Sequence, residues 1–280
     1  MSTNSSSHSL LGLPVEVLMC ILDHAELCDL YWLSQTCKSM QRLAKRDFRT
    51  MVNTNVEDKA EFLLGLAYVL PDHCFCEKHC MLHTVDRHAP LVMSPHCWDY
   101  SVNHRRIYVT GYDLQYQHIQ LALKYNRLGG SYRDALAPLM RTHYESYSRG
   151  PLGPDIHFSA TPEIKNGHFL LHEEWILKAH CNLPCYFMNV YVPICNHIDL
   201  LGCSPRNNLL QGFHGATWCL RRHATPLENQ EMEGSRRGSC KTCSTSFVFS
   251  VPREKKVVLN TTHDYGSFHS LDEWKRRSWE

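Results

Sequence analysis

The chain has 280 residues and a formal net charge of +1, with 29 basic and 28 acidic residues. Hydrophobic residues make up 43% and charged residues 20%, which is typical of a globular protein and excludes disorder throughout the chain. The balanced charge excludes an overall electrostatic attraction to nucleic acid or to an anionic membrane. The longest apolar run, Phe62–Leu70, is shorter than the ~20 residues that cross a bilayer. One large domain, or a small module joined to a medium one, is expected.

The N-terminus and the cysteine content indicate a reducing compartment. Residues 1–9 are rich in serine and lack the basic and apolar regions of a secretory signal, so we expect a disordered tail. The protein is therefore expected in the cytoplasm or the nucleus, where thiols stay reduced. With 14 cysteines beside 19 histidines, the composition favours bound zinc over disulfides.

Apolar residues recur at helical spacing through the N-terminal quarter of the chain. We predict a first helix behind Pro14, a second capped by Asp29, a third over 40–51, and a fourth that Asp58 caps and Pro71 ends. Further along, the pattern predicts helices over 114–128 and 132–140, the first stopped by Gly129-Gly130, and a loop over 144–154.

From Ile156 onward the apolar period becomes two. Strands over 156–161 and 168–179 flank Lys165-Asn166-Gly167, which predicts a hairpin, and a strand is expected over 185–192. Residues 202–237 are predicted to form a long loop, followed by a second hairpin over 247–251 and 256–260.

These elements predict an α+β fold in which a three-helix N-terminal module precedes a mixed helical and β-hairpin domain with stabilising zinc. The expected divisions are a tail over 1–9, the module over 10–51, and a C-terminal domain over 56–280, helical over 56–140 and β-rich over 156–262.

The N-terminal module carries two spaced motifs. Leu13-Pro14-Val15-Glu16 forms an LPxE segment, and Leu30, Leu33 and Thr36-Cys37-Lys38 follow at matching distances. In these residues the module resembles an F-box. The resemblance implies docking onto the Skp adaptor of a cullin–RING ubiquitin ligase, by Pro14 and its neighbours and by faces of the first two helices.

The module also has more apolar residues than so small a core can bury. The alternative is that the surplus packs only on residues 56–280. The candidate partner-binding residues are Leu11, Leu13, Pro14, Val17, Leu18, Ile21, Leu22, Leu30 and Leu33.

A Cys-x2-Cys pair, Cys240 and Cys243, stands directly before the second predicted hairpin, as zinc knuckles do. Cys195 and His197, on a predicted turn, are the preferred second pair, with Cys181 and Cys185 as alternatives. A zinc ion held by Cys195, His197, Cys240 and Cys243 would be structural, because three thiolates and one imidazole leave no open position.

A second cluster lies in the segment 72–90, where Cys76, Cys80 and His83 have usable spacing for a further zinc ion. For both clusters the alternative is reduced, partly buried thiols, since free cysteine is often buried. Redox chemistry at Cys240 and Cys243 is a third reading, although no βαβ pattern surrounds them.

The remaining motifs extend the resemblance to fungal F-box proteins with a Cys/His-rich C-terminal region. They are Leu70-Pro71-Asp72-His73, Asn126-Arg127-Leu128-Gly129, Ile194-Cys195-Asn196-His197, Cys240-Lys241-Thr242-Cys243, and Asp264-Tyr265-Gly266 with Trp274. The resemblance names no substrate.

No phosphate-binding loop or nucleophile elbow is present, and His172-Glu173-Glu174 lacks the second histidine of a zinc protease motif. A Cys/His protease stays open as an alternative. We expect a non-catalytic subunit of a ubiquitin ligase that holds an unknown protein target and reaches cullin through the Skp-type adaptor.

The alternative from another class is a zinc-stabilised module that binds nucleic acid or protein outside a ligase. Short basic clusters such as Arg105-Arg106 and Lys275-Arg276-Arg277 would carry nucleic acid, but such runs are usually solvated and the neutral net charge favours protein partners. No membrane partner is expected.

Overall fold

The computed structural model describes residues 10–88, 114–148, 154–178, 191–195, 197–203, 217–221, 235–250 and 256–268. The chain forms two compact units, Met1–His83 and Thr84–Glu280. The predicted tail over 1–9 and most of the predicted strand over 185–192 lie outside the described residues. Within the described part, no helix combines the length and the apolar character that a membrane crossing needs.

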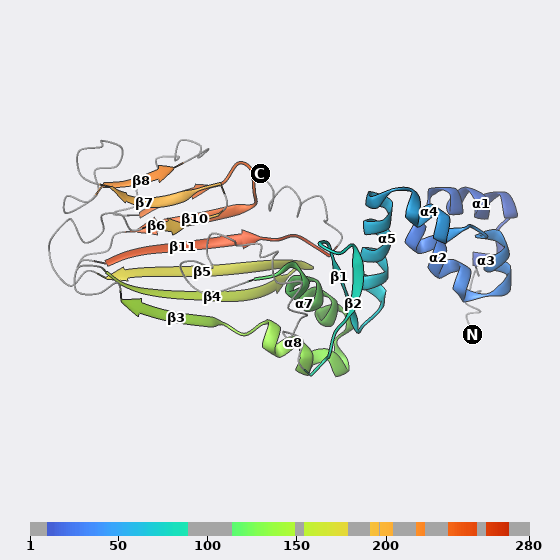
Figure 1. The fold of residues 1–280 in the computed structure, drawn as a ribbon, viewed down its shortest axis with the longest axis horizontal. Coiled ribbons are helices and arrows are strands. Elements are labelled where there is room, and N and C mark those ends of the chain that lie inside the picture. The colour runs from blue at the N-terminus through green and yellow to red at the C-terminus, as the bar shows by residue number, and fades with distance from the viewer. Residues whose placement is uncertain are drawn as a thin grey trace, which may run out of the picture. The chain divides into compact units, whose positions relative to one another are not determined.

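The first unit is helical and ends in a small hairpin (Figure 1). Its elements are η1 (Leu10–Gly12), α1 (Val15–His24), α2 (Leu27–Thr36), α3 (Lys38–Leu43), α4 (Phe48–Thr54), α5 (Val56–Val69), β1 (His73–Cys76) and β2 (Met81–Thr84). The side chains of Leu22, Leu30, Met40 and Ala44 form one buried cluster at the centre of α1 to α3. Helix α5 packs on α2, where an added Cβ at Gly65 would lie only 2.5 Å from the sulfur of Cys28.

The helix predictions for this unit hold in outline and differ at the caps. The first helix begins directly after Pro14, as predicted. Helix α2 begins at Leu27 and not behind Asp29, which lies in its first turn, where a carboxylate faces the positive end of the helix dipole. Asn55 and not Asp58 caps α5, because the Asn55 side chain accepts the backbone N–H of Glu57 at 3.0 Å.

The predicted single helix over 40–51 is wrong, because the chain breaks it into α3 and α4. The carboxylate of Asp47 accepts the backbone N–H of Thr50 at 3.1 Å and so starts α4.

The first unit extends to His83. The helix over 56–69, which we expected in the C-terminal domain, therefore groups with the N-terminal helices.

The second unit is built on a six-stranded antiparallel sheet with the strand order β3-β4-β5-β11-β10-β9. Helix α7 packs on β5, and a separate three-stranded sheet has the order β6-β7-β8 (Figure 1). Its elements are α7 (Tyr116–Leu128), η3 (Gly130–Tyr132), α8 (Arg133–Leu139), β3 (His143–Ser148), β4 (Asp155–Lys165), β5 (His168–Lys178), β6 (Tyr191–Pro193), β7 (Asp199–Cys203), β8 (Thr217–Arg221), β9 (Ser235–Ser239), β10 (Thr245–Ser250) and β11 (Lys256–Asp264).

The hairpin of β4 and β5 is the longest local pairing in the described chain. Its register runs from Lys165↔His168 to Asp155↔Lys178. The turn residues Asn166 and Gly167 have φ of 53° and 78°, the left-handed values that a tight two-residue hairpin turn requires. The hairpin predicted from this Asn-Gly pair is therefore confirmed, as is the antiparallel pairing of β10 with β11.

Two predicted loops contain strands. Residues 144–154 were expected to form a loop, but β3 pairs with β4 along its length. Residues 202–237 include the end of β7, all of β8 and the start of β9. Strand β3 was missed because it is an edge strand whose exposed positions are polar, so its sequence shows no apolar alternation. Its pairing with β4 depends on backbone hydrogen bonds, which the amino-acid composition does not reveal.

Candidate metal centre

Two turns of the second unit each present a pair of metal-binding side chains. The first lies between β6 and β7, where the backbone N–H groups of Ile194 and Cys195 donate to the carbonyl of Ile198 at 2.9 and 3.1 Å. The second lies between β9 and β10, where Cys240 N–H donates to the Thr245 carbonyl at 2.8 Å. These bonds hold each turn tightly, so that Cys195 with His197, and Cys240 with Cys243, lie on compact loops.

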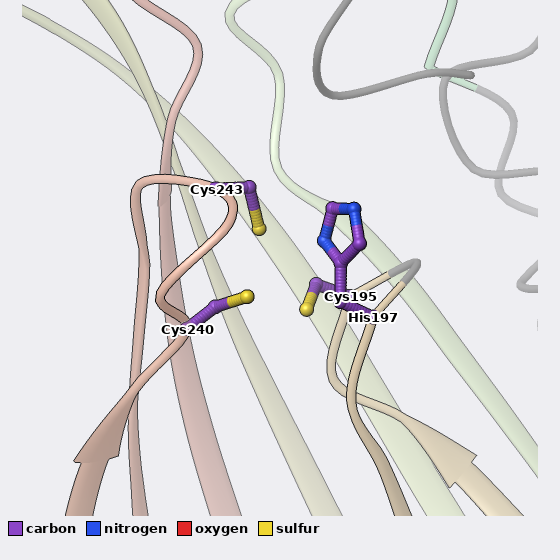
Figure 2. A group of neighbouring side chains, drawn as sticks. All are labelled: Cys195, His197, Cys240 and Cys243. Carbon is purple, nitrogen blue, oxygen red and sulfur yellow. The ribbon is translucent and has the colours of Figure 1, made fainter. Parts of the chain in front are cut away.

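The two turns face each other (Figure 2). The ligand atoms of Cys195, His197, Cys240 and Cys243 all lie within 4.8 Å of one another. Tetrahedral zinc with Zn–S of about 2.3 Å and Zn–N of about 2.0 Å needs ligand separations of roughly 3.3–3.8 Å, so small side-chain adjustments suffice. Three sulfurs and one imidazole are a closed donor set for a structural zinc ion.

The pKa values of two thiols in this cluster are shifted by their surroundings. A hydrogen bond from the Cys195 thiol, with further ones from Thr245 and His197, lowers the pKa of Cys243 to about 4. The same hydrogen bond, together with burial, raises the pKa of Cys195. Cys243 is therefore the more acidic thiol of the pair, and a metal ion bound by both sulfurs would displace the proton of Cys195.

His197 supplies a second reason to place a cation here. Its side chain is 6% exposed, and both ring nitrogens are buried without a well-aligned hydrogen-bond partner in the described part of the chain. A buried imidazole without well-aligned hydrogen bonds costs free energy, of the order of 1–3 kcal/mol for an unsatisfied polar group. Coordination of a metal ion by one nitrogen would remove that cost.

A buried polar chain leads from the cluster into the six-stranded sheet. The hydroxyl of Thr245 lies 3.2 Å from Cys243 Sγ and 3.0 Å from His263 Nδ1. On the other side of the ring, His263 Nε2 lies 3.3 Å from the Glu173 carboxylate, which also accepts the Thr261 hydroxyl at 3.1 Å. With Cys243 as a thiolate, Thr245 donates to the sulfur and accepts from His263, so these residues orient and tune the cluster.

Replacing Thr245 by valine is expected to weaken zinc binding about 10–100-fold, because the sulfur of Cys243 loses its hydrogen-bond donor at nearly unchanged volume. Competition with a chromogenic chelator measures this affinity. Thr262→Val is the matched control, because the Thr262 hydroxyl contacts His172 Nδ1 at 3.1 Å and no residue of the cluster. Equal zinc affinity of the Thr245→Val variant and the unmodified protein would contradict the assigned role.

The sequence analysis named all four residues of this cluster, and the structure brings them together. The alternatives Cys181 and Cys185 lie outside the described residues. Sequence reasoning missed Thr245, His263 and Glu173. Each of these polar residues stands at a position of β5, β10 or β11 whose side chain points to the buried face of the sheet. A polar residue at such a position of the alternating pattern is the sequence signal that could have identified them.

The second predicted cluster needs a correction. The group of neighbouring ligand atoms in the first unit is Cys76, His79 and His83, and Cys80 is not part of it. Cys80 has a φ of 45° in the turn between β1 and β2, whereas His79 brings Nδ1 to 3.3 Å from Cys76 Sγ. The spacing alone could not distinguish two neighbouring turn residues.

The predicted partner-binding residues divide between two faces of α1 and α2. Leu18, Leu22 and Leu30 are 4%, 2% and 6% exposed, so their side chains belong to the core of the first unit. Leu33 is partly buried against the same core. Leu13, Pro14, Val17 and Ile21 are exposed, and nothing is described of the Leu11 side chain.

The exposed residues form a stripe along α1. Val17 and Ile21 lie one turn apart on α1 and are 44% and 42% exposed, and Leu13, just before the helix, is 40% exposed. Leu18 and Leu22, on a neighbouring face of α1, fill the core. A helix with both a core stripe and an exposed apolar stripe is typical of a protein-binding surface.

Comparison with family models matches residues 10–52 to the F-box-like family. The chain contains an F-box-like domain. No curated protein and no solved structure matches the chain. The F-box-like domain covers η1 and α1 to α3, together with the first part of α4, so the exposed stripe of α1 belongs to it. An F-box-like domain indicates an adaptor that binds a Skp-type protein in ubiquitin ligases. The likeness of residues 53–280 to fungal F-box proteins stays a prediction.

Proposed function

We propose that this protein is the target-binding subunit of a Skp–cullin–F-box ubiquitin ligase. The F-box-like domain would dock on the Skp-type adaptor and through it reach cullin, and the second unit would bind the protein to be ubiquitinated. The subunit would be non-catalytic, since it would act by holding the target near catalytic groups supplied by other subunits.

The exposed apolar stripe of Leu13, Val17 and Ile21 carries the proposal. The core of the first three helices is complete without these side chains, because Leu22, Leu30, Met40 and Ala44 already fill it. Burial of apolar surface contributes about 25 cal/mol per Å². A partner that covered the stripe would therefore gain binding free energy without disturbing the fold.

The second unit offers a concave surface for a target. An open groove of about 440 Å³ crosses β3, β4 and β5 and is lined by Tyr144, His157, Glu174 and Lys178 among others. Tyr144 is 76% exposed there. The volume falls in the range of sites that accept a few side chains of a bound molecule.

Expression of the tagged full chain with a Skp-type adaptor and cullin tests the proposal. Co-elution of all three proteins through gel filtration is the expected result. Failure of the chain to bind any Skp-type adaptor, while the purified chain retains its helical circular dichroism, would overturn the ligase assignment.

A further inference from the structure

The hairpin of β1 and β2 in the first unit gathers one cysteine and two histidines. Cys76 ends β1, His79 lies in the turn, and His83 lies in β2. Their ligand atoms are within 4.8 Å of one another, and Cys76 Sγ lies 3.3 Å from His79 Nδ1. The rings of His79 and His83 meet edge to face, with centroids 5.7 Å apart.

These separations suit one small cation. A thiolate and two imidazoles around zinc lie roughly 3.3–3.6 Å apart, given Zn–S of about 2.3 Å and Zn–N of about 2.0–2.1 Å. Mixed sulfur and imidazole donors favour zinc over magnesium or calcium, which take oxygen ligands. Cys76 is fully buried, whereas His79 is exposed, so an ion here would lie between the core and the surface.

The burial of Cys76 argues against nucleophilic catalysis, the other function that a Cys–His pair can have. A nucleophilic cysteine must reach a substrate, but the side chain of Cys76 has no exposed surface. A metal ligand needs only one lone pair directed at the ion, and the neighbouring imidazoles supply the remaining contacts.

We propose that Cys76, His79 and His83 hold a second zinc ion, with three protein ligands and a fourth position open to an added ligand. Among the described residues no fourth ligand atom joins this group. In this proposal the first ion has four protein ligands, and the second has three among the described residues and a position for water or an incoming imidazole.

The ion would also stabilise its hairpin. Strands β1 and β2 have four residues each, and a two-stranded hairpin of this size is marginally stable by itself. Coordination joins the end of β1, the turn and β2, and it therefore fixes the register of the pair. Helix α5 packs on β1, which connects the hairpin to the helices of the same unit.

Zinc stoichiometry of the full chain tests the ligand set. The protein is purified without chelator, and native mass spectrometry counts the bound ions. We expect two zinc ions in the unmodified protein, one in His79→Asn and two in Cys80→Ser. His79 is exposed, so its replacement leaves the core intact. Two ions in His79→Asn, or one ion in the unmodified protein that Cys243→Ser removes, would overturn the proposal.

Cobalt(II) in place of zinc tests the open position. Imidazole added to the cobalt-loaded protein is expected to shift the visible bands of the unmodified protein and to leave those of His79→Asn unchanged. A spectrum of the unmodified protein that does not respond to imidazole would contradict an open position. Should Cys80→Ser lose the ion while His79→Asn keeps it, the ligand would be Cys80 and the proposed set would be wrong.

Discussion

Replacing Ile21 by aspartate is expected to weaken binding of the Skp-type adaptor at least 100-fold, equivalent to about 2.7 kcal/mol. Ile21 is 42% exposed in the free chain, so the change leaves the F-box-like core in place. In the complex it would bury a carboxylate without a partner, which is costly. Titration calorimetry of the full chain with the adaptor measures the loss.

The double change Leu13→Ala, Pro14→Ala extends this test along the same stripe. It should also weaken adaptor binding by orders of magnitude, because truncation of a leucine at a packed site costs about 2–5 kcal/mol. Val56→Asp is the matched control, since Val56 is 73% exposed and lies outside residues 10–52. If the control and the Ile21→Asp variant bind the adaptor equally well, α1 is not the docking surface.

Removing the metal from the first cluster is expected to loosen the second unit and to leave the helices of the first unit folded. At zinc concentrations about 1,000-fold above the dissociation constant, binding stabilises by about 4 kcal/mol, which corresponds to about 8–16 °C in melting temperature for a unit of this size. Cys240→Ser should reproduce the effect of a chelator, since Cys240 is 9% exposed and belongs to the four-ligand group.

Hydrogen exchange read by mass spectrometry locates the change. Protection should fall first in the turns around Cys195 and Cys240, while α1 to α5 keep theirs. Cys20→Ser is the control, because Cys20 is exposed and belongs to neither cluster. Equal protection of both turns before and after chelation would remove the structural role of the metal.

The sequence predicts those parts of the fold that local chemistry determines. The Asn166-Gly167 turn requires left-handed backbone, and few residues other than asparagine and glycine adopt it, so the hairpin of β4 and β5 could be placed exactly where it lies. Helix starts were less certain, because Asp29 and Asp58 stand within a few residues of the true caps Glu26 and Asn55. Any of these side chains suits a first turn.

For the metal clusters, too, the sequence predicts local pairs of ligands but not the contacts between distant residues. Cys240-x2-Cys243 and Cys195-x-His197 each occupy one tight turn, and their spacing identifies them as pairs. The polar chain through Thr245, His263 and Glu173 could not be predicted, because Glu173 and His263 are 90 residues apart and only the pairing of β5 with β11 brings them together. The choice between His79 and Cys80 likewise depends on the left-handed backbone at Cys80.

The pairing of β5 with β11 has a consequence for the order of synthesis. His172 on β5 meets Thr262 on β11, 90 residues later, so a ribosome that adds 5–20 residues per second needs about 5–18 s between the two. The β4–β5 hairpin can close from local contacts well within that interval. Until β11 arrives, the β5 edge of the nascent chain carries unpaired backbone groups beside Trp175 and Leu177, which are fully buried in the finished sheet. Such an edge can pair with another chain, so folding yield in the cell should depend on chaperones that hold nascent chains.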